Sequence, residues 1–128
     1  MAKTEVHHPD KAVSTGAYSA GVLIDGWLFI NGQGPIDLAT GTVIPGTIEE
    51  ETSARAFSHR KDSNRCRLPL RRCREVYLPP RGYRDFDDFN RTYSTFFSGV
   101  RPARTTVQSV LWGGIKVEID AIARVPSR

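Results

Sequence analysis

Residues 101–125, RPARTTVQSVLWGGIKVEIDAIARV, carry the clearest structural pattern in the chain. Apolar and polar residues alternate in ARTTVQSVLW and again in IKVEIDAIARV, and such alternation is typical of half-buried β-strands. The sequence therefore predicts two strands here, on either side of Gly113-Gly114. Side chains alternate across a strand, so the second strand has one apolar face and one mostly polar face. The apolar face holds Val117, Ile119, Ala121 and Ala123, and the other face holds Lys116, Glu118, Asp120 and Ile122.

A second pair of strands is predicted upstream, in residues 16–34, GAYSAGVLIDGWLFINGQG. Apolar residues recur at every second position on both sides of Asp25-Gly26, a dipeptide that suits a tight hairpin turn. Residues 1–13 are predicted to form a loose arm or an edge strand. Residues 35–46 have the composition of loops and turns.

Two helices are predicted between these strand pairs. The first begins at Thr47, because Glu50 three residues later completes a capping-box pattern and acidic residues crowd the first turn. The second covers residues 85–97, DFDDFNRTYSTFF, and Gly99 is placed to end it. Its aromatic residues recur at helical spacing, which core packing explains better than a ligand site: Phe86, Phe89, Tyr93, Phe96 and Phe97. These elements predict an α+β domain with helices packed on a sheet.

Composition restricts the class of protein. With 128 residues, 39% of them hydrophobic, we expect one globular domain, residues 1–128. The chain has no apolar run of membrane-spanning length and no signal-peptide pattern at its N-terminus, so we expect a cytoplasmic protein. His7 and His8 have no partners at metal-ligand spacing, and no metal site or phosphate loop is predicted.

Residues 59–84, HRKDSNRCRLPLRRCREVYLPPRGYR, do not fit this pattern. Residues 57–84 hold nine of the 18 Lys and Arg residues but two of the 14 acids, so the rest of the chain has nine basic and twelve acidic residues, net −3. The net charge of +4 therefore comes from this segment. It also holds Cys66 and Cys73, whose spacing is not that of a zinc site. A basic segment of this kind is one pattern of nucleic-acid-binding proteins.

The segments on either side resemble the reactive intermediate deaminase family, also called Rid or YjgF. The resemblance covers about residues 1–56 and 85–128. It rests on GAYSAGVLIDGWLFINGQGPIDLATG, on DFDDFNRTYSTFF and, above all, on PAR followed one strand later by VEIDAIA. It implies a chorismate-mutase-like fold with a mixed β-sheet and two helices on one face, in the order β-β-α-β-α-β-β. It also implies a homotrimer with sites between the subunits.

Between EEET and DFDDFN the family has a helix that ends in Ala-Ala-Gly, then Asp-Asp-Val-Val-Lys and an apolar strand. This chain has the right length there but a different text. Reading codons 58–79 one nucleotide forward can turn residues 58–63 into Ala-Ile-Glu-Lys-Ile-Leu, residues 64–67 into Thr-Ala-Ala-Gly, and residues 71–75 into Asp-Asp-Val-Val-Lys. The sequence therefore indicates that about residues 57–84 are translated in a shifted reading frame. The cause would be either a sequencing error or a real pair of compensating insertions or deletions. A genuine basic insert is the alternative.

The restored text also fits the physics of the fold. It places apolar residues at positions 56, 59, 62 and 63, which continues the first helix to about residue 66, and a glycine at position 67 to end it. A strand should follow near residues 73–80. As printed, that region would have to hold Pro79, Pro80 and several cations, although proline lacks a ladder donor and buried unpaired charges are costly.

Two residues carry the chemistry that the resemblance implies. Arg104, in PARTT, matches the arginine with which the family binds the substrate carboxylate, and a planar guanidinium suits that geometry. Glu118, in KVEID, matches the glutamate that helps to position or activate water, a role that fits a carboxylate able to exchange protons. From the residues alone, each could instead be an ordinary charged residue on the surface of a strand.

Other residues complete the expected substrate pocket: Tyr18, Asn31, Gly32, Gln33, Asn90 and Thr106. Tyr18 matches a family tyrosine that closes over ligand, with simple packing as the alternative. Asn90 could equally be a polar residue on a helix face. Asn31 stands where the family often has Ser, and Thr106 stands where many members have Cys, so the substrate preference stays open.

The resemblance implies an imine deaminase that needs no cofactor. Its partners would be a small imino or oxo acid and further copies of the chain, with no membrane and no nucleic acid. Substrates such as 2-iminopropanoate and 2-iminobutanoate would be hydrolysed to 2-oxo acids and ammonia. One alternative is a non-catalytic binder of small carboxylates, which the Asn31 and Thr106 departures favour. The other is an RNA-binding or endoribonuclease-like relative, whose support is the basic segment and disappears if the frame is shifted.

Overall fold

The computed structural model describes residues 2–7, 16–32, 35, 37, 39–53, 73–78 and 83–124. Several predictions from the sequence fall outside these residues and stay untested. They concern the end of the first helix near residue 66, the side chain of Gln33, and His8 and Cys66.

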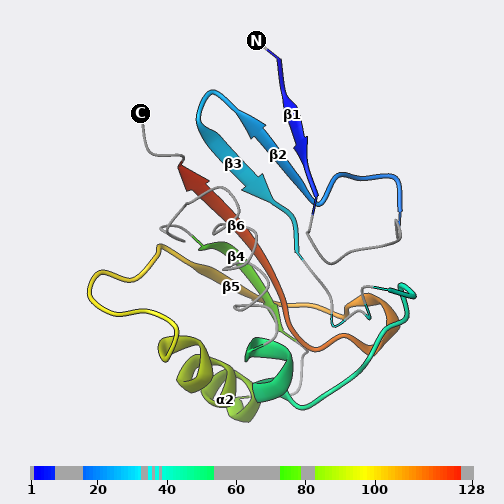
Figure 1. Cartoon of the computed structure of the whole chain (residues 1–128). Helices are drawn as coiled ribbons and strands as arrows, with labels where there is room; N and C mark the ends of the chain where they lie inside the picture. Colours follow the sequence, from blue (N-terminus) through cyan, green and yellow to red (C-terminus); the bar gives the residue numbers. More distant parts are fainter. Residues whose placement is uncertain are drawn as a thin grey trace.

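The described strands form one six-stranded sheet in the order β1-β2-β3-β6-β4-β5 (Figure 1). β4 and β5 run parallel and the other pairs run antiparallel, so the sheet is mixed, as expected. The N-terminal arm supplies an edge strand, and the strand predicted near residues 73–80 is present as β4. The bounds are β1 Thr4–Val6, β2 Gly21–Ile24, β3 Trp27–Ile30, β4 Cys73–Leu78, β5 Thr105–Gln108 and β6 Glu118–Arg124.

The hairpin predicted around Asp25-Gly26 is confirmed. β2 and β3 pair with Ile24 opposite Trp27, which leaves a two-residue turn. Both turn residues have positive φ, 51° at Asp25 and 73° at Gly26. A turn of this hand matches the twist of the two strands, and Asp-Gly is one of the few dipeptides that adopt it at low cost.

The two C-terminal strands are both present, but they are not neighbours in the sheet. β4 lies between β5 and β6, pairing parallel with one and antiparallel with the other. The nine residues 109–117 make the crossing, and Gly113-Gly114 belongs to a short 3-10 helix, Trp112–Gly114, within it. The glycine pair therefore turns the chain inside a crossover and does not close a hairpin.

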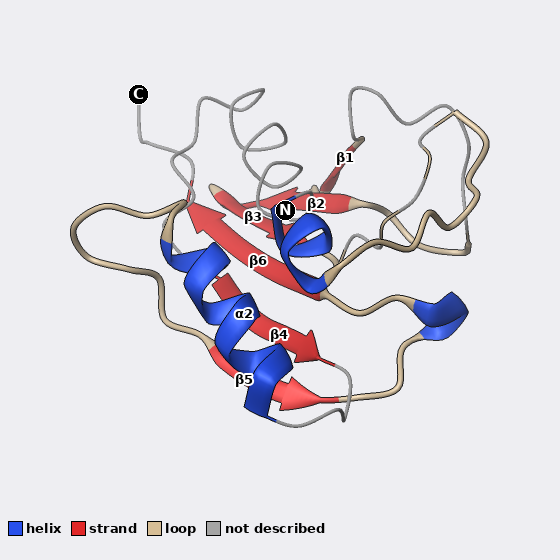
Figure 2. Cartoon of the chain, turned by 90° about the horizontal axis from the view of Figure 1, so that it is seen from below, coloured by secondary structure: helices blue, strands red, loops and turns tan. Residues whose placement is uncertain are grey.

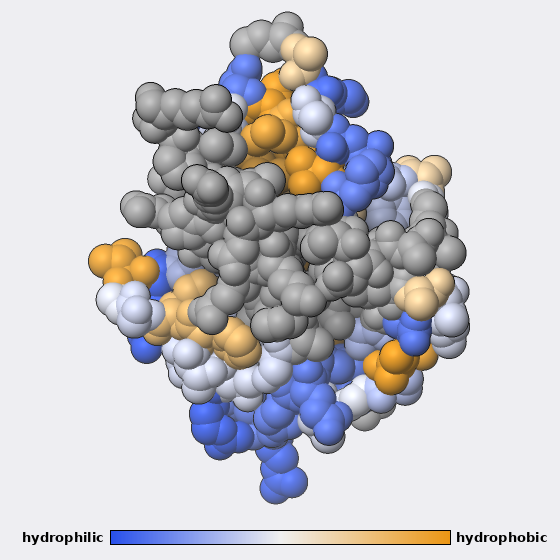
Figure 3. All heavy atoms as spheres, viewed as in Figure 1, coloured by the Kyte–Doolittle hydropathy of each residue, from blue (hydrophilic) through white to orange (hydrophobic). Residues whose placement is uncertain are grey.

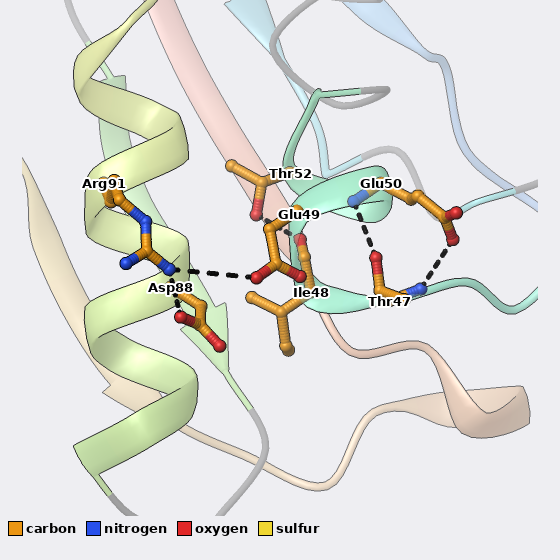
Figure 4. Close-up of polar contacts among 7 residues, drawn as sticks. All are labelled: Thr47, Ile48, Glu49, Glu50, Thr52, Asp88 and Arg91. Carbon is orange, nitrogen blue, oxygen red and sulfur yellow. Dashed lines mark hydrogen bonds and ion pairs between the residues drawn. The ribbon is translucent and has the colours of Figure 1, made fainter.

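The first helix starts at residue 48 and is described to residue 53. Its predicted capping box is confirmed (Figure 4). The Glu50 backbone N–H donates to Thr47 Oγ1 at 3.1 Å, and the Thr47 N–H donates to Glu50 Oε2 at 2.8 Å. This reciprocal pair satisfies two N–H groups that a helix start leaves without intrahelical partners.

The second helix, α2, spans Tyr83–Ser94 and ends earlier than predicted. In its last turn Ser94 Oγ and Thr95 Oγ1 donate to the carbonyls of Arg91 and Thr92, both at 2.7 Å. Hydroxyl side chains that bond nearby backbone groups in this way compete with further helical bonds. Gly99, predicted to end the helix, lies in the loop beyond it with a φ of 72°.

The helices cover one part of the sheet. Figure 2 shows α2 and the helix at 48–53 on the same side of the strands. Between them and the sheet lies a core of Ile48, Phe89, Tyr93, Val117 and Ile119. The aromatic stripe of α2 is therefore only partly buried, because Phe86 remains 37% exposed.

A second core lies over the hairpin strands, and β6 contributes to both cores. Its predicted apolar face is confirmed, because alternate residues of the segment are buried from Val117 to Ala123. The second core consists of Leu28, Ile30, Ala121 and Ala123, with Val6 and Leu23 packed against it. In the same view as Figure 1, Figure 3 shows hydrophobic spheres gathered in the upper part of the molecule, where β1–β3 lie. None of the described helices is both long and hydrophobic enough to cross a bilayer.

Candidate functional site

Arg104 lies just before β5, where α2 holds its side chain. The guanidinium carbon stands over three aromatic rings of that helix, 4.9 Å from the centroid of Tyr93, 5.1 Å from Phe89 and 5.9 Å from Phe86. Arg104 Nη2 also donates to Asn90 Oδ1 at 2.9 Å. Sequence reasoning placed both residues in the pocket, and the structure brings them into direct contact.

This arrangement fits a carboxylate-binding arginine. The negative faces of the rings attract the cation and restrict the conformations of the side chain. Binding a ligand therefore costs less conformational entropy than it would for an exposed arginine. A guanidinium has five N–H donors, of which the contact with Asn90 uses one. The remaining donors include a parallel pair of the kind that binds a carboxylate through two hydrogen bonds.

Glu118 is the first residue of β6, and its side chain leaves from the face opposite the helices. Its neighbours Val117 and Ile119 are both buried in the core beneath α2, and successive side chains of a strand point to opposite faces. The Glu118 side chain packs directly on Gly32. A Cβ atom on Gly32 would lie 2.7 Å from Glu118 Cδ, which is closer than real side chains approach. Gly32 therefore has to be a glycine for Glu118 to keep this position.

Tyr18 and Asn31 lie at the same end of the hairpin as Gly32. Asn31 follows β3 and its N–H donates to the carbonyl of Ala20, just before β2, at 3.1 Å. Tyr18 is 48% exposed, and its ring covers Gly16, where a Cβ atom would lie 2.7 Å from Tyr18 Cε1. β6 runs antiparallel to β3, so β6 begins at this end of the hairpin, and Glu118 is its first residue. The structure thus groups four of the expected site residues around one end of β2, β3 and β6.

Thr106 belongs with Arg104 and not with Glu118. It pairs with Val76 of β4, which in turn pairs with Ile119 of β6. Residues directly opposite in a ladder share a face of the sheet, so Thr106 lies on the side of the helices. Within a single chain, the expected site residues therefore form two groups on opposite faces. Arg104, Asn90 and Thr106 lie on the helix side, and Glu118 and Gly32 lie on the other.

Sequence reasoning missed Glu51, which is a buried acid of the first helix, 2% exposed. Its carboxylate accepts hydrogen bonds from the backbone just before Glu118, at Lys116 and Val117. Glu51 is the third of three consecutive glutamates, and nothing in the sequence distinguishes it from Glu49 and Glu50. A helical projection with Ile48 and Thr52 on the core face would have been the available signal.

Comparisons with known proteins agree with the fold and the motifs. No family model matches the chain. A RutC family protein of Saccharolobus solfataricus is 33% identical over 110 residues, which cover 85% of this chain and 87% of that protein. The 2-iminobutanoate/2-iminopropanoate deaminase of Rattus norvegicus is 30% identical over 109 residues, covering 84% of this chain and 80% of the enzyme.

The comparison with solved structures points to the same family. A Rid family protein of Yersinia pestis superposes with a TM-score of 0.82 at 26% identity, covering 97% of this chain and all of that one. Sequence and fold agree over nearly the whole length, as the resemblance of the flanking segments implied. The chain therefore belongs to the Rid (YjgF) family.

Proposed function

We propose that the protein hydrolyses 2-imino acids such as 2-iminopropanoate and 2-iminobutanoate to 2-oxo acids and ammonia. The observation that carries the proposal is the setting of Arg104, a cation held over three aromatic rings and hydrogen-bonded to Asn90. A family relative at 30% identity bears the name of this deaminase, which supports the same chemistry.

In the proposed reaction Arg104 binds the substrate carboxylate through two hydrogen bonds and thereby orients the C=N carbon. Glu118 accepts a proton from water as the water oxygen bonds to that carbon. The same carboxyl group then returns a proton to the nitrogen. The hydroxyl proton of the tetrahedral adduct also passes to the nitrogen, the C–N bond breaks as the C=O bond forms, ammonia leaves, and the 2-oxo acid remains. No electron is gained or lost, so hydrolysis needs only water.

The two groups of residues on opposite faces support a site shared between copies of the chain. Arg104 of one copy would meet Glu118 of a neighbour, with Tyr18 and Asn31 beside Glu118 and Thr106 beside Arg104. A contact that joins two different faces of identical chains is head-to-tail, and it closes into a ring when the rotation allows. A homotrimer is the ring that we propose, with its sites in the interfaces.

The direct test supplies freshly generated 2-iminopropanoate and follows the release of 2-oxo acid and ammonia. We expect a rate above spontaneous hydrolysis for the wild-type chain and a rate close to the spontaneous one for Glu118→Gln. Equal rates with and without the wild-type protein would refute the deaminase.

A non-catalytic binder of small carboxylates is the second candidate, and Thr106 favours it. Thr106 has a hydroxyl where many family members have a thiol, so it can hydrogen-bond a ligand but cannot provide thiol chemistry. A 2-oxo acid that binds to the protein, without any acceleration of imine hydrolysis, would favour this candidate. The RNA-binding alternative rests on the basic segment, most of which lies outside the described residues.

A further inference from the structure

A buried carboxylate joins the first helix to the start of β6. Glu51, 2% exposed, accepts a hydrogen bond at Oε2 from the N–H of Lys116 at 2.7 Å and another from the N–H of Val117 at 3.0 Å. Its other oxygen, Oε1, accepts from the N–H of Gly46 at 3.3 Å. These bonds connect parts of the chain that are 65 and 66 residues apart in the sequence.

Lys116 makes a second connection between the same two segments. Its Nζ donates to the carbonyl oxygen of Gly46 at 2.6 Å, directly before the helix. A buried carboxylate is costly unless hydrogen bonds satisfy it, and charge-assisted bonds to backbone N–H groups are stronger than neutral ones. Glu51 also lies in the first turn of its helix, where the helix dipole favours negative charge. The arrangement is therefore a stable link and not an incidental contact.

The position of this link within β6 indicates what it is for. β6 begins at Glu118, directly after the two residues whose N–H groups bind Glu51. In the described part of the chain, the Glu51 carboxylate thus accepts hydrogen bonds from the N–H groups of residues 116 and 117, as the carbonyl groups of a neighbouring strand would. Val117, fully buried, anchors the same backbone from the core side. Glu51 and Val117 thus both fix, from the helix side of the sheet, the backbone from which the Glu118 side chain leaves.

We propose that Glu51 is a positioning residue for Glu118, holding the start of β6 so that the Glu118 carboxylate faces the reacting water. This role rests on the proposed function. Glu51 is buried and its two carboxylate oxygens accept backbone hydrogen bonds, so in the proposed site it would not bind substrate. Its loss should therefore lower kcat and leave KM, which Arg104 controls in the proposed function, nearly unchanged. A displacement of about 1 Å in a catalytic group costs on the order of 100-fold in rate.

The test compares three variants. Glu51→Asp keeps the charge but withdraws both oxygens by about 1.5 Å, one C–C bond. Glu51→Gln keeps one oxygen that can accept from both Lys116 and Val117 and gives up only the longer bond, 3.3 Å, from the Gly46 N–H. Thr52→Val is the matched control: Thr52 is fully buried in the same helix turn, and its Oγ1 donates only within the helix, to the Ile48 carbonyl at 2.6 Å. It removes a hydrogen bond within the helix and leaves the bonds from the N–H groups of residues 116 and 117 to Glu51 in place.

Two structural readouts do not depend on activity. These are hydrogen exchange at the amides of Lys116 and Val117, and the ¹³C shift of the Glu118 carboxyl carbon. We expect faster exchange, a changed shift and a 10- to 100-fold lower kcat for Glu51→Asp, at nearly constant KM, as estimated from the same misplacement cost. Glu51→Gln should lie close to wild type in all of these. Thr52→Val should lower the melting temperature and leave exchange at the two amides, the carboxyl shift and kcat per folded molecule unchanged.

Wild-type exchange and an unchanged Glu118 shift in Glu51→Asp would overturn the positioning role, whether or not the protein is a deaminase. An equal loss of kcat in Thr52→Val would also overturn it, because the effect would then be general destabilisation. Changed structural readouts in a protein whose wild type shows no deaminase activity would instead refute the proposed function and support the link.

Discussion

Substitution of Gly32 by alanine tests the position of Glu118 with a single methyl group. The added Cβ would lie 2.7 Å from Glu118 Cδ and closer still to Glu118 Cγ, where ordinary contacts begin at 3.4 Å, so the glutamate has to move by about 1 Å or rotate away. Gly32 is not among the glycines with positive φ, so its backbone should accept alanine and the effect should be steric.

The expected loss follows from the size of this displacement. At about 100-fold in rate for 1 Å, a shift of about 1 Å predicts a kcat lower by on the order of 100-fold. Overpacking costs about 1–3 kcal/mol in a core, and the half-buried setting of Gly32 places the expected loss of stability near the lower end. Steady-state kinetics on 2-iminopropanoate and thermal unfolding measure the two quantities separately.

Gly26→Ala is the matched control. Gly26 has a φ of 73°, so alanine is strained there, but nothing lies within 4 Å of its added Cβ. This control should lose stability and keep kcat. A folded Gly32→Ala protein with wild-type kcat would refute the reasoning, because Glu118 would then act without its contact to Gly32 or would not act at all.

Two further substitutions and one sequencing experiment test other parts of the chain. Arg104→Lys loses the planar fork and its stacking on the rings of α2, so we expect KM to rise about 10-fold or more with the fold intact, measured by steady-state kinetics and circular dichroism; an unchanged KM would remove Arg104 from the substrate site. Thr47→Ala removes one half of the capping box, and we expect a loss of about 1 kcal/mol, a fall of about 4 °C in Tm by calorimetry, with no change in kcat. Nucleotide sequencing across codons 50–90 should show compensating insertions or deletions near codons 56–58 and 80–85, either in the gene or as errors in the printed sequence. A gene that encodes residues 58–79 as printed, with no such shift nearby, would instead show that the basic segment is genuine.

Local signals predicted most of the elements. Asp25-Gly26 defines its hairpin and Thr47 with Glu50 defines the helix start, because each involves residues close in the sequence. The alternation in β6 predicted its buried face, because the period of a strand depends only on the chain itself. Even in the segment with the irregular text, the resemblance predicted a strand where β4 lies.

Pairing between distant segments could not be predicted from local signals. The position of β4 between β5 and β6 depends on contacts between distant segments, so the sequence predicts the two strands around Gly113-Gly114 but not that β4 separates them. The three glutamates after Ile48 show the same limit. Glu49 lies 3.9 Å from Arg91 of α2, Glu50 caps its own helix, and Glu51 is buried against residues 116–117 (Figure 4 shows the first two). Identical residues acquire different roles from the elements around them.

The structure divides the site residues that the family motif groups together. The resemblance assigned Arg104, Asn90, Glu118 and Gly32 to one pocket, and the structure brings Arg104 against Asn90 and Glu118 against Gly32. The motif did not indicate that the two pairs lie on opposite faces of one chain. That separation depends on the side of the sheet that α2 covers, and it makes the account testable by mixing chains.

Co-expression of Arg104→Lys and Glu118→Gln chains tests the central claim most directly. If Arg104 of one copy and Glu118 of its neighbour form a site, random mixing in a ring of identical interfaces leaves both residues intact at about a quarter of the sites. At 2-iminopropanoate concentrations well below KM, we predict that Glu118→Gln alone is close to the spontaneous rate and that Arg104→Lys alone keeps at most about a tenth of the wild-type rate. We predict that the mixture recovers about a quarter of the wild-type rate by the same estimate. A mixture no faster than the separate variants, with mixed assemblies confirmed by native mass spectrometry, would contradict a site shared between copies.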